Sequence, residues 1–149
     1  MQIIKMAEEV VAKNTVKNGT YNDEICIITL VDLDGYPSSS VITPAKADGI
    51  RTIWFGINAD SSKMKHLKKN TKACVCFGSG EYNISLTGEA EAISDLKVKQ
   101  EIWYNGLEHH FAGFDDPTYY ALKFTTKRYD LLFPEAGYIR GEIEKSYEN

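Results

Sequence analysis

The sequence lacks several features that would place it in a specialised class of protein. Its 149 residues include only three cysteines, none in a Cys-x-x-Cys pair, so neither a disulfide framework nor a structural zinc site is expected. No apolar run reaches the roughly 18 residues of a membrane span. The first residues also lack the sustained apolar core of a signal peptide. A reducing cytoplasm is therefore the simplest location, with no membrane partner.

Basic residues are not in excess either. Lys and Arg number 17 against 21 Asp and Glu, which gives a net charge of −4. Nucleic-acid binding needs a basic footprint, so no nucleic-acid partner is expected. The length fits one domain of roughly 150 residues, large enough to bury a core without disulfides. We therefore treat residues 1–149 as a single domain.

The sequence also lacks the motifs of several catalytic classes. It contains no Gly-x-Ser-x-Gly elbow, P-loop, Gly-x-Gly-x-x-Gly or His-Glu-x-x-His motif. His109 and His110 are adjacent, and on an extended chain they point to opposite sides, so no metal site is expected. Cys26, Cys74 and Cys76 lie in strand-like segments and are interpreted as small buried side chains.

What the sequence does contain is a series of strand-like segments joined by tight turns. Asp34-Gly35 and Asp48-Gly49 favour hairpins, because these residues tolerate positive φ. The predicted strands cover residues 25–31, 38–45, 51–57, 73–77, 82–92, 119–126, 128–133 and 138–143. Helices are predicted over residues 3–11, over 60–70 with Asp60 or Ser61 as N-cap, and after a cap at Ser94.

Short connections predict an antiparallel sheet, because parallel strands need long crossovers. Residues 25–31 are apolar on both alternating faces, so this strand is expected to be covered on both sides. Closing such a sheet into a barrel hides its edges and fills its interior. The predicted fold class is mainly β, or α+β by helix content: an antiparallel β-barrel of about six strands with a few peripheral helices.

Residues 54–63 have the pattern of a strand end, a turn and a helix start. Free N–H groups at the helix start, the hydroxyls of Ser61 and Ser62, and the Lys63 ammonium together suit a phosphate group. Three more lysines follow in the same segment: Lys65, Lys68 and Lys69. The alternative interpretation is a capped helix whose lysines are merely solvated.

Small polar residues occupy the predicted strand between Pro37 and Pro44. Ser38, Ser39 and Ser40 would let a flat ligand approach the backbone closely. Serine clusters are also common in turns, so the segment alone does not decide between the two interpretations.

These segments, taken in order, resemble the pyridoxamine 5′-phosphate oxidase-like family of FMN-binding split barrels, and most closely its small general-stress-protein branch. The similar stretches are residues 34–40, 53–63, 70–77 and 103–124, the last with Trp103 and His110 to Pro117. The resemblance covers nearly the whole chain. Each motif is short, and their order and spacing carry the likeness.

The resemblance implies a split barrel, a homodimer and FMN at the subunit interface. In such proteins the Ser-x-Lys at the helix start holds the FMN phosphate, and the neighbouring strand ends lie beside the ring and the ribityl chain. Trp103 is expected either near the ring, from the other subunit, or in the barrel core. The cofactor-binding residues implied are Ser39, Ser40, Val41, Ile42, Phe55, Gly56, Ile57, Asn58, Ser61, Ser62, Lys63 and Trp103.

Two departures from the family pattern shape the functional prediction. Many relatives carry an arginine where this chain has Ser39-Ser40, so a bidentate phosphate partner is missing. The sequence also ends soon after Arg140, without the arginine-containing segment that holds substrate in true pyridoxamine phosphate oxidases, so vitamin B6 oxidation is not expected.

The leading hypothesis is an FMN-dependent oxidoreductase of unknown substrate, with NADH or NADPH as electron donor and no residue assigned to catalysis. The first alternative is a non-catalytic carrier or sensor that binds flavin or haem, with FAD or haem replacing FMN and His109 or His110 as an axial ligand. The second is a dimeric structural protein without a ligand.

Overall fold

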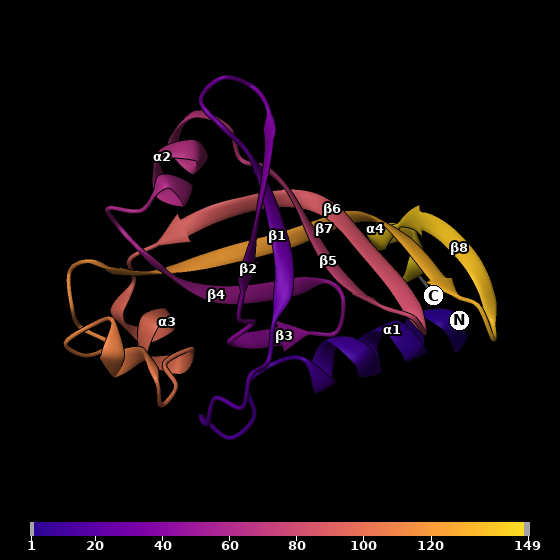
Figure 1. Cartoon of the computed structure of the whole chain (residues 1–149), viewed down its shortest axis with the longest axis horizontal. Helices are drawn as coiled ribbons and strands as arrows, with labels where there is room; N and C mark the ends of the chain where they lie inside the picture. Colours follow the sequence, from indigo (N-terminus) through magenta and orange to yellow (C-terminus); the bar gives the residue numbers. More distant parts are fainter. Residues whose placement is uncertain (1, 148–149) are drawn as a thin grey trace.

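Strands with alternating apolar positions build one antiparallel sheet, shown in Figure 1. The computed structural model describes residues 2–147. The eight-stranded sheet has the order β2-β1-β5-β6-β7-β4-β3, and β8 also pairs with β7. The strands are β1 (Cys26–Val31), β2 (Pro37–Ile42), β3 (Lys46–Asp48), β4 (Thr52–Asn58), β5 (Lys72–Ser79), β6 (Tyr82–Ile93), β7 (Tyr119–Phe133) and β8 (Gly137–Glu142).

Helices lie at the periphery of this sheet. They are α1 (Gln2–Lys13), α2 (Ser62–Lys69), α3 (Leu96–Glu101) and α4 (Ile143–Ser146), together with a 3-10 turn, η1 (Leu107–His109). In Figure 1, β1 and β2 cross steeply in front of β4, β6 and β7. β2 and β3 end the strand order without pairing to each other, so the barrel stays open there. The predicted class, a split antiparallel barrel with peripheral helices, is confirmed.

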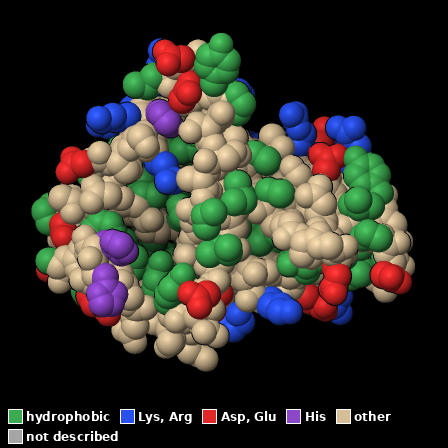
Figure 2. Space-filling model, viewed as in Figure 1, with side chains coloured by type: hydrophobic (Ala, Val, Ile, Leu, Met, Phe, Trp, Pro, Cys, Tyr) green, Lys and Arg blue, Asp and Glu red, His purple; other side chains and the backbone are tan. Residues whose placement is uncertain are grey.

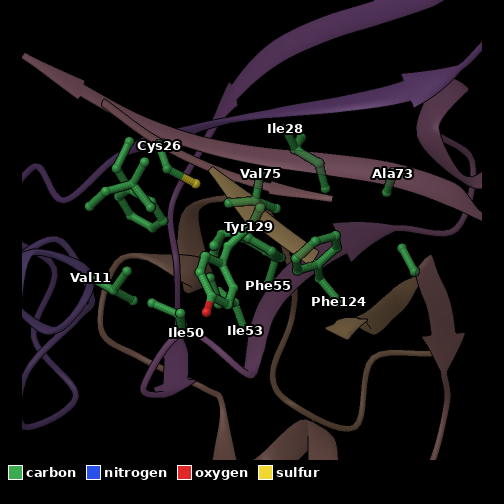
Figure 3. Close-up of a cluster of buried hydrophobic side chains, with 14 of the residues drawn as sticks. Val11, Cys26, Ile28, Ile50, Ile53, Phe55, Ala73, Val75, Phe124 and Tyr129 are labelled. Carbon is green, nitrogen blue, oxygen red and sulfur yellow. The ribbon is translucent and has the colours of Figure 1, made fainter. Parts of the chain in front are cut away.

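The interior of the barrel is filled by every second residue of the strands. In β4 these are Ile53, Phe55 and Ile57, and in β5 they include Val75 and Phe77. Figure 3 shows side chains from α1, β1, β4, β5 and β7 pointing toward one another in this core. The amphipathic helix α1 closes one end with its buried face, which consists of Ile4, Ala7 and Val11.

Two strand predictions differ from the structure near prolines and glycines. The strand predicted over 38–45 ends at Ile42, and residues 46–48 form a separate short strand paired with β4. Pro44, which has no N–H to donate, lies between them. The strands predicted over 119–126 and 128–133 are one continuous strand, β7. The pairing of β6 with β7 changes register between Thr87 and Gly88, and β7 continues as one strand through the predicted break.

Helix capping also differs at one of the two predicted positions. Ser61 is the N-cap of α2, and its hydroxyl accepts a hydrogen bond from the Met64 N–H at 3.3 Å. The N-cap of α3 is Asp95 rather than Ser94, because the Asp95 carboxylate accepts from the Val98 N–H at 3.1 Å. Both serine and aspartate cap well, so the sequence alone did not separate the two neighbours.

A second hydrophobic cluster lies outside the barrel, where α3 and η1 pack against β4 and β7. Its buried members are Ile102, Leu107, Phe111, Tyr119 and Ala121. The Tyr119 ring is at its centre, 4.9 Å from the Phe111 ring and 5.3 Å from the Trp103 ring. This cluster places the irregular segment 105–117 beside the end of β4.

Within residues 2–147, no helix is long and apolar enough to cross a membrane.

Candidate functional site

A cavity of about 380 Å³ lies at the open seam of the barrel, between the ends of β2 and β4. Its size is within the range of roughly 300–1,000 Å³ typical of small-molecule sites. The lining residues are Val41, Ile42, Thr43, Gly56, Ile57, Asn58, Tyr104, Leu107, His110 and Phe111. Figure 2 shows a hollow left of the centre, with histidine and hydrophobic side chains around it.

Because Gly56 has no side chain, the second hydrophobic cluster packs directly against the β4 backbone beside this cavity. A Cβ atom at this position would lie 3.0 Å from Cε1 of the Tyr119 ring and 3.7 Å from Leu107 Cδ2. The ring therefore packs directly on the β4 backbone, and the segment that carries Leu107 and Phe111 closes one wall. A larger residue at position 56 would push this wall away.

The cavity wall is polar and apolar in about equal parts, and its four polar side chains are Thr43, Asn58, Tyr104 and His110. Burial raises the pKa of the Tyr104 phenol, an effect that a hydrogen bond from Thr43 partly offsets. The phenol is therefore protonated at neutral pH and can donate a hydrogen bond. The Asn58 side-chain oxygen already accepts from the Asp60 N–H at 2.8 Å, which leaves its NH₂ group to donate.

The start of α2 follows this cavity directly along the chain. Ser61 caps the helix, and the first-turn N–H groups of Ser62 and Lys63 have no acceptor within the helix. Within residues 2–147, the half-buried Lys63 ammonium forms no ion pair. Lys65 and Lys68 are exposed on the same helix. These groups suit an anion, whereas the exposed Asp60 carboxylate next to Ser61 opposes one.

Part of the outer side of β1, β2, β5 and β6 is a sheet surface without charge. We call it the uncharged outer face, and its residues are Ile27, Thr29, Ser39, Val41, Cys74, Cys76, Ser85 and Thr87. Ile27 is 36% exposed and Val41 59% exposed. Charged residues border it on three strands: Lys72 of β5 pairs with Glu89 of β6, and Asp130 and Arg128 of β7 lie opposite Ser85 and Thr87. Figure 2 shows hydrophobic side chains gathered at the centre of this view, where β1 and β2 lie.

This face corrects the expectation that β1 is covered on both sides. In the single chain only its inner side is covered, and Ile25 and Ile27 are exposed.

The prediction that all three cysteines are buried is right in part. Cys26 is buried, and burial raises the pKa of its thiol to about 12. Cys74 and Cys76 are half-exposed on the uncharged outer face, although burial still raises the pKa of Cys76.

The structure brings most of the predicted binding residues to one end of the barrel. Five of them line the cavity: Val41, Ile42, Gly56, Ile57 and Asn58. Ser61, Ser62 and Lys63 follow at the start of α2. Ser39 and Ser40 precede the cavity on β2, and the Ser39 hydroxyl lies 2.7 Å from that of Thr29 on the outer face.

Two predicted residues are separated from the cavity. The Phe55 side chain is fully buried in the barrel core, so only its backbone can contact a ligand at this strand end. Trp103 packs edge-on against Tyr119 in the second hydrophobic cluster and is not part of the cavity wall. In the single chain Trp103 therefore lies neither in the barrel core nor in the cavity.

Sequence reasoning missed four residues of the cavity wall: Thr43, Tyr104, Leu107 and Phe111. It named His110 only as an axial ligand in the haem alternative. The wall residues beyond position 103 come from an irregular segment, where no periodicity indicates which side chains point inward. The available signal was its unusual content of aromatic and histidine residues in a region without regular structure. Within residues 2–147, no group of three or more His, Cys, Asp or Glu side chains is arranged to hold a metal ion.

The fold and the cavity define the class of protein: a split β-barrel with a ligand-sized cavity at its seam. The model of the pyridoxamine 5′-phosphate oxidase family matches residues 14–133. The chain belongs to this family.

Three known proteins illustrate the similarity. A crystal structure from Clostridium acetobutylicum, of a protein related to general stress protein 26, has a TM-score of 0.81, 26% identity and 98% coverage of both chains. General stress protein 26 of Bacillus subtilis is 26% identical over 95 residues, which span 60% of this chain and 66% of that protein. A haem-binding protein from Mycobacterium smegmatis has a TM-score of 0.71 and 12% identity, and the match covers 95% of this chain and 58% of that one.

Proposed function

We propose that this protein binds FMN, with the ring in the seam cavity and the phosphate at the start of α2. The observation that carries the proposal is the continuity of the two sites. Asn58 lines the cavity and Ser61 to Lys63 form the helix start, so one short segment serves both. A phosphorylated ligand with a flat ring matches this combination of a ligand-sized cavity and an anion site.

The start of α2 carries groups whose chemistry suits the FMN phosphate. The start of α2 offers two first-turn N–H groups, two serine hydroxyls and the Lys63 ammonium, without an arginine. A charge-assisted hydrogen bond contributes roughly 1.5–3 kcal/mol, so Lys63 and the serines replace part of what an arginine supplies in relatives. The exposed Asp60 carboxylate opposes an anion and keeps the expected affinity moderate.

FMN, when bound, supplies electron transfer, and the protein supplies binding and orientation. Tyr104 stays protonated and donates a hydrogen bond from the cavity wall. Ile57, Leu107 and Phe111 supply apolar surface against which the ring packs. We therefore propose a flavin-dependent oxidoreductase, for which NADH and NADPH are the electron donors to test.

A second copy of the chain is the proposed partner, and it covers the uncharged outer face. Exposed apolar side chains at Ile25, Ile27 and Val41 carry a cost in water, which burial against an identical face removes. Val41 belongs both to this face and to the cavity wall, so the proposed interface borders the ligand site. This arrangement supports the proposal of a flavin site at a homodimer interface.

The test is a fluorescence titration of the purified protein with FMN. Saturable quenching at micromolar FMN supports the proposal, and NADH or NADPH is then added under anaerobic conditions to follow bleaching of the flavin absorbance. Quenching without bleaching by either nucleotide favours a carrier or sensor over an oxidoreductase. No quenching at all contradicts the flavin site.

Haem is a second candidate ligand, because His110 lines the cavity and one relative of similar fold is a haem-binding protein. A titration with haemin checks this. A Soret band that shifts with wild-type protein but not with His110→Ala would favour haem. His109→Ala, which removes the neighbouring exposed imidazole, is the control.

A further inference from the structure

A second cavity, of about 500 Å³, lies between α1 and the ends of β6 and β7, in a region separate from the seam. Its lining residues are Met6, Glu9, Val10, Lys13, Gly80, Glu81, Tyr82, Phe133, Pro134 and Glu135. None of them lines the seam cavity, so the proposed flavin site does not use this region.

The apolar part of this groove is built from two aromatic rings and two side chains of α1. The Tyr82 and Phe133 rings lie 6.0 Å apart with an interplanar angle of 39°. Met6 and Val10 approach from the helix and are only half-buried. Phe133 is almost fully buried, whereas Tyr82 remains partly accessible. Aromatic surface of this kind attracts apolar groups and, through the ring faces, cations.

The charged part of the groove is predominantly negative. Glu9, Glu81 and Glu135 are exposed around it, and Lys13 is the one basic residue in its lining. Within residues 2–147, none of these four side chains takes part in an ion pair. Three carboxylates against one ammonium repel an organic anion and attract a cation.

From these contacts we propose that the groove binds a small hydrophobic organic cation, such as an aromatic or alkyl ammonium ion. The apolar body of the ligand packs between α1 and the Tyr82 and Phe133 rings. Its positive group lies among the carboxylates at the mouth. The proposal does not depend on flavin binding, because the two cavities share no residue.

The test uses the full chain, ¹⁵N-labelled, and three probes of similar size: benzyltrimethylammonium, benzyl alcohol and benzoate. We expect the cation to shift the amide resonances of Val10, Gly80 and Tyr82, and to bind at least about fivefold more tightly than benzoate. Equal affinity for the three probes, or shifts confined to other regions, would overturn the proposal.

Variants then separate charge from shape. Glu81→Gln with Glu135→Gln should weaken cation binding at least about threefold and leave benzyl alcohol unaffected, because only the charged partner is changed. Glu91→Gln, at an exposed carboxylate outside the groove, is the matched control. Tyr82→Phe should retain binding and Tyr82→Leu should reduce it. Unchanged affinity in the double glutamine variant contradicts the assignment. Both glutamine changes are at exposed residues and do not threaten folding.

Discussion

The two faces of the same strands differ in a way that the single chain does not explain. On β6 the inner residues Ile84 and Leu86 are fully buried, while the outer residues Ser85 and Thr87 are partly exposed yet uncharged. Inner positions are apolar because they fill the barrel. The residues of the uncharged outer face are free to carry charge, as the exposed Lys72 and Glu89 beside it do, yet none of them is charged. The contrast teaches that the inner face stabilises the chain, whereas the outer face is suited to a partner.

The largest expected effect is a loss of stability from the inner face. Leu86→Ala removes a fully buried side chain and leaves a cavity, so the free energy of unfolding should fall by about 2–5 kcal/mol. Thr87→Ala, one residue further along on the outer side, should change it by less than about 0.5 kcal/mol. Urea unfolding of both variants measures the difference, and similar losses would contradict the contrast between the faces.

The next effect is on assembly. Ile27→Glu places a charge in the uncharged outer face, and an unpaired charge is costly to bury, so the dimer should dissociate at least about a hundredfold more readily. Leu96→Glu, at an exposed apolar residue of α3, is the control. Sedimentation velocity over a range of concentrations gives the dissociation constants. A wild-type protein that remains monomeric would refute the partner proposed for this face.

A smaller effect is expected at the seam beside this face. Lys63→Ala should weaken FMN binding about tenfold or more, because it removes the ammonium that pairs with the phosphate. Lys68→Ala, an exposed lysine on the same helix, should have little effect. The melting temperature without ligand should be the same for both variants. Equal affinity of the two for FMN would remove Lys63 from the site.

Tyr104→Phe tests the ring end of the same site with a smaller expected change. Losing one neutral hydrogen bond should weaken binding of lumiflavin, which has no phosphate, by about two- to tenfold. Tyr21→Phe is the matched control, because the Tyr21 ring stacks on that of Tyr104 but is not part of the cavity wall. Isothermal titration with lumiflavin and FMN compares them, and identical affinities would exclude Tyr104 as a donor to the ring.

The smallest effect concerns the cavity wall at low pH. The Asp116 carboxylate accepts hydrogen bonds from the Ala112 and Thr118 N–H groups at 2.9 and 2.8 Å, and these bonds hold the pKa of the carboxyl below its ordinary value. Its contribution is therefore complete above pH of about 4 and is lost as pH falls through the lowered pKa. The protection factor of the Ala112 amide, which is its intrinsic exchange rate divided by the observed rate, should fall there, and Asp116→Asn should abolish that pH dependence.

The sequence predicted the parts of the site that depend on local order. Alternation in β4 and β6, the turns at Gly35 and Gly49, and the Ser61 cap with Lys63 beside it follow from short-range rules of backbone geometry and hydrogen bonding. Each of these features needs only residues a few positions apart, so they were readable before the strands were assembled.

Tertiary structure alone decided where the barrel opens and what lines the opening. Thr43 and Tyr104 are far apart in the chain and meet only because the second hydrophobic cluster packs η1 beside β4. The ends of β2 and β4 form one cavity because strand pairing leaves β2 and β3 unjoined. Alternation specifies which side of a strand is buried, but long-range packing specifies which strand ends meet, and that contact makes the site.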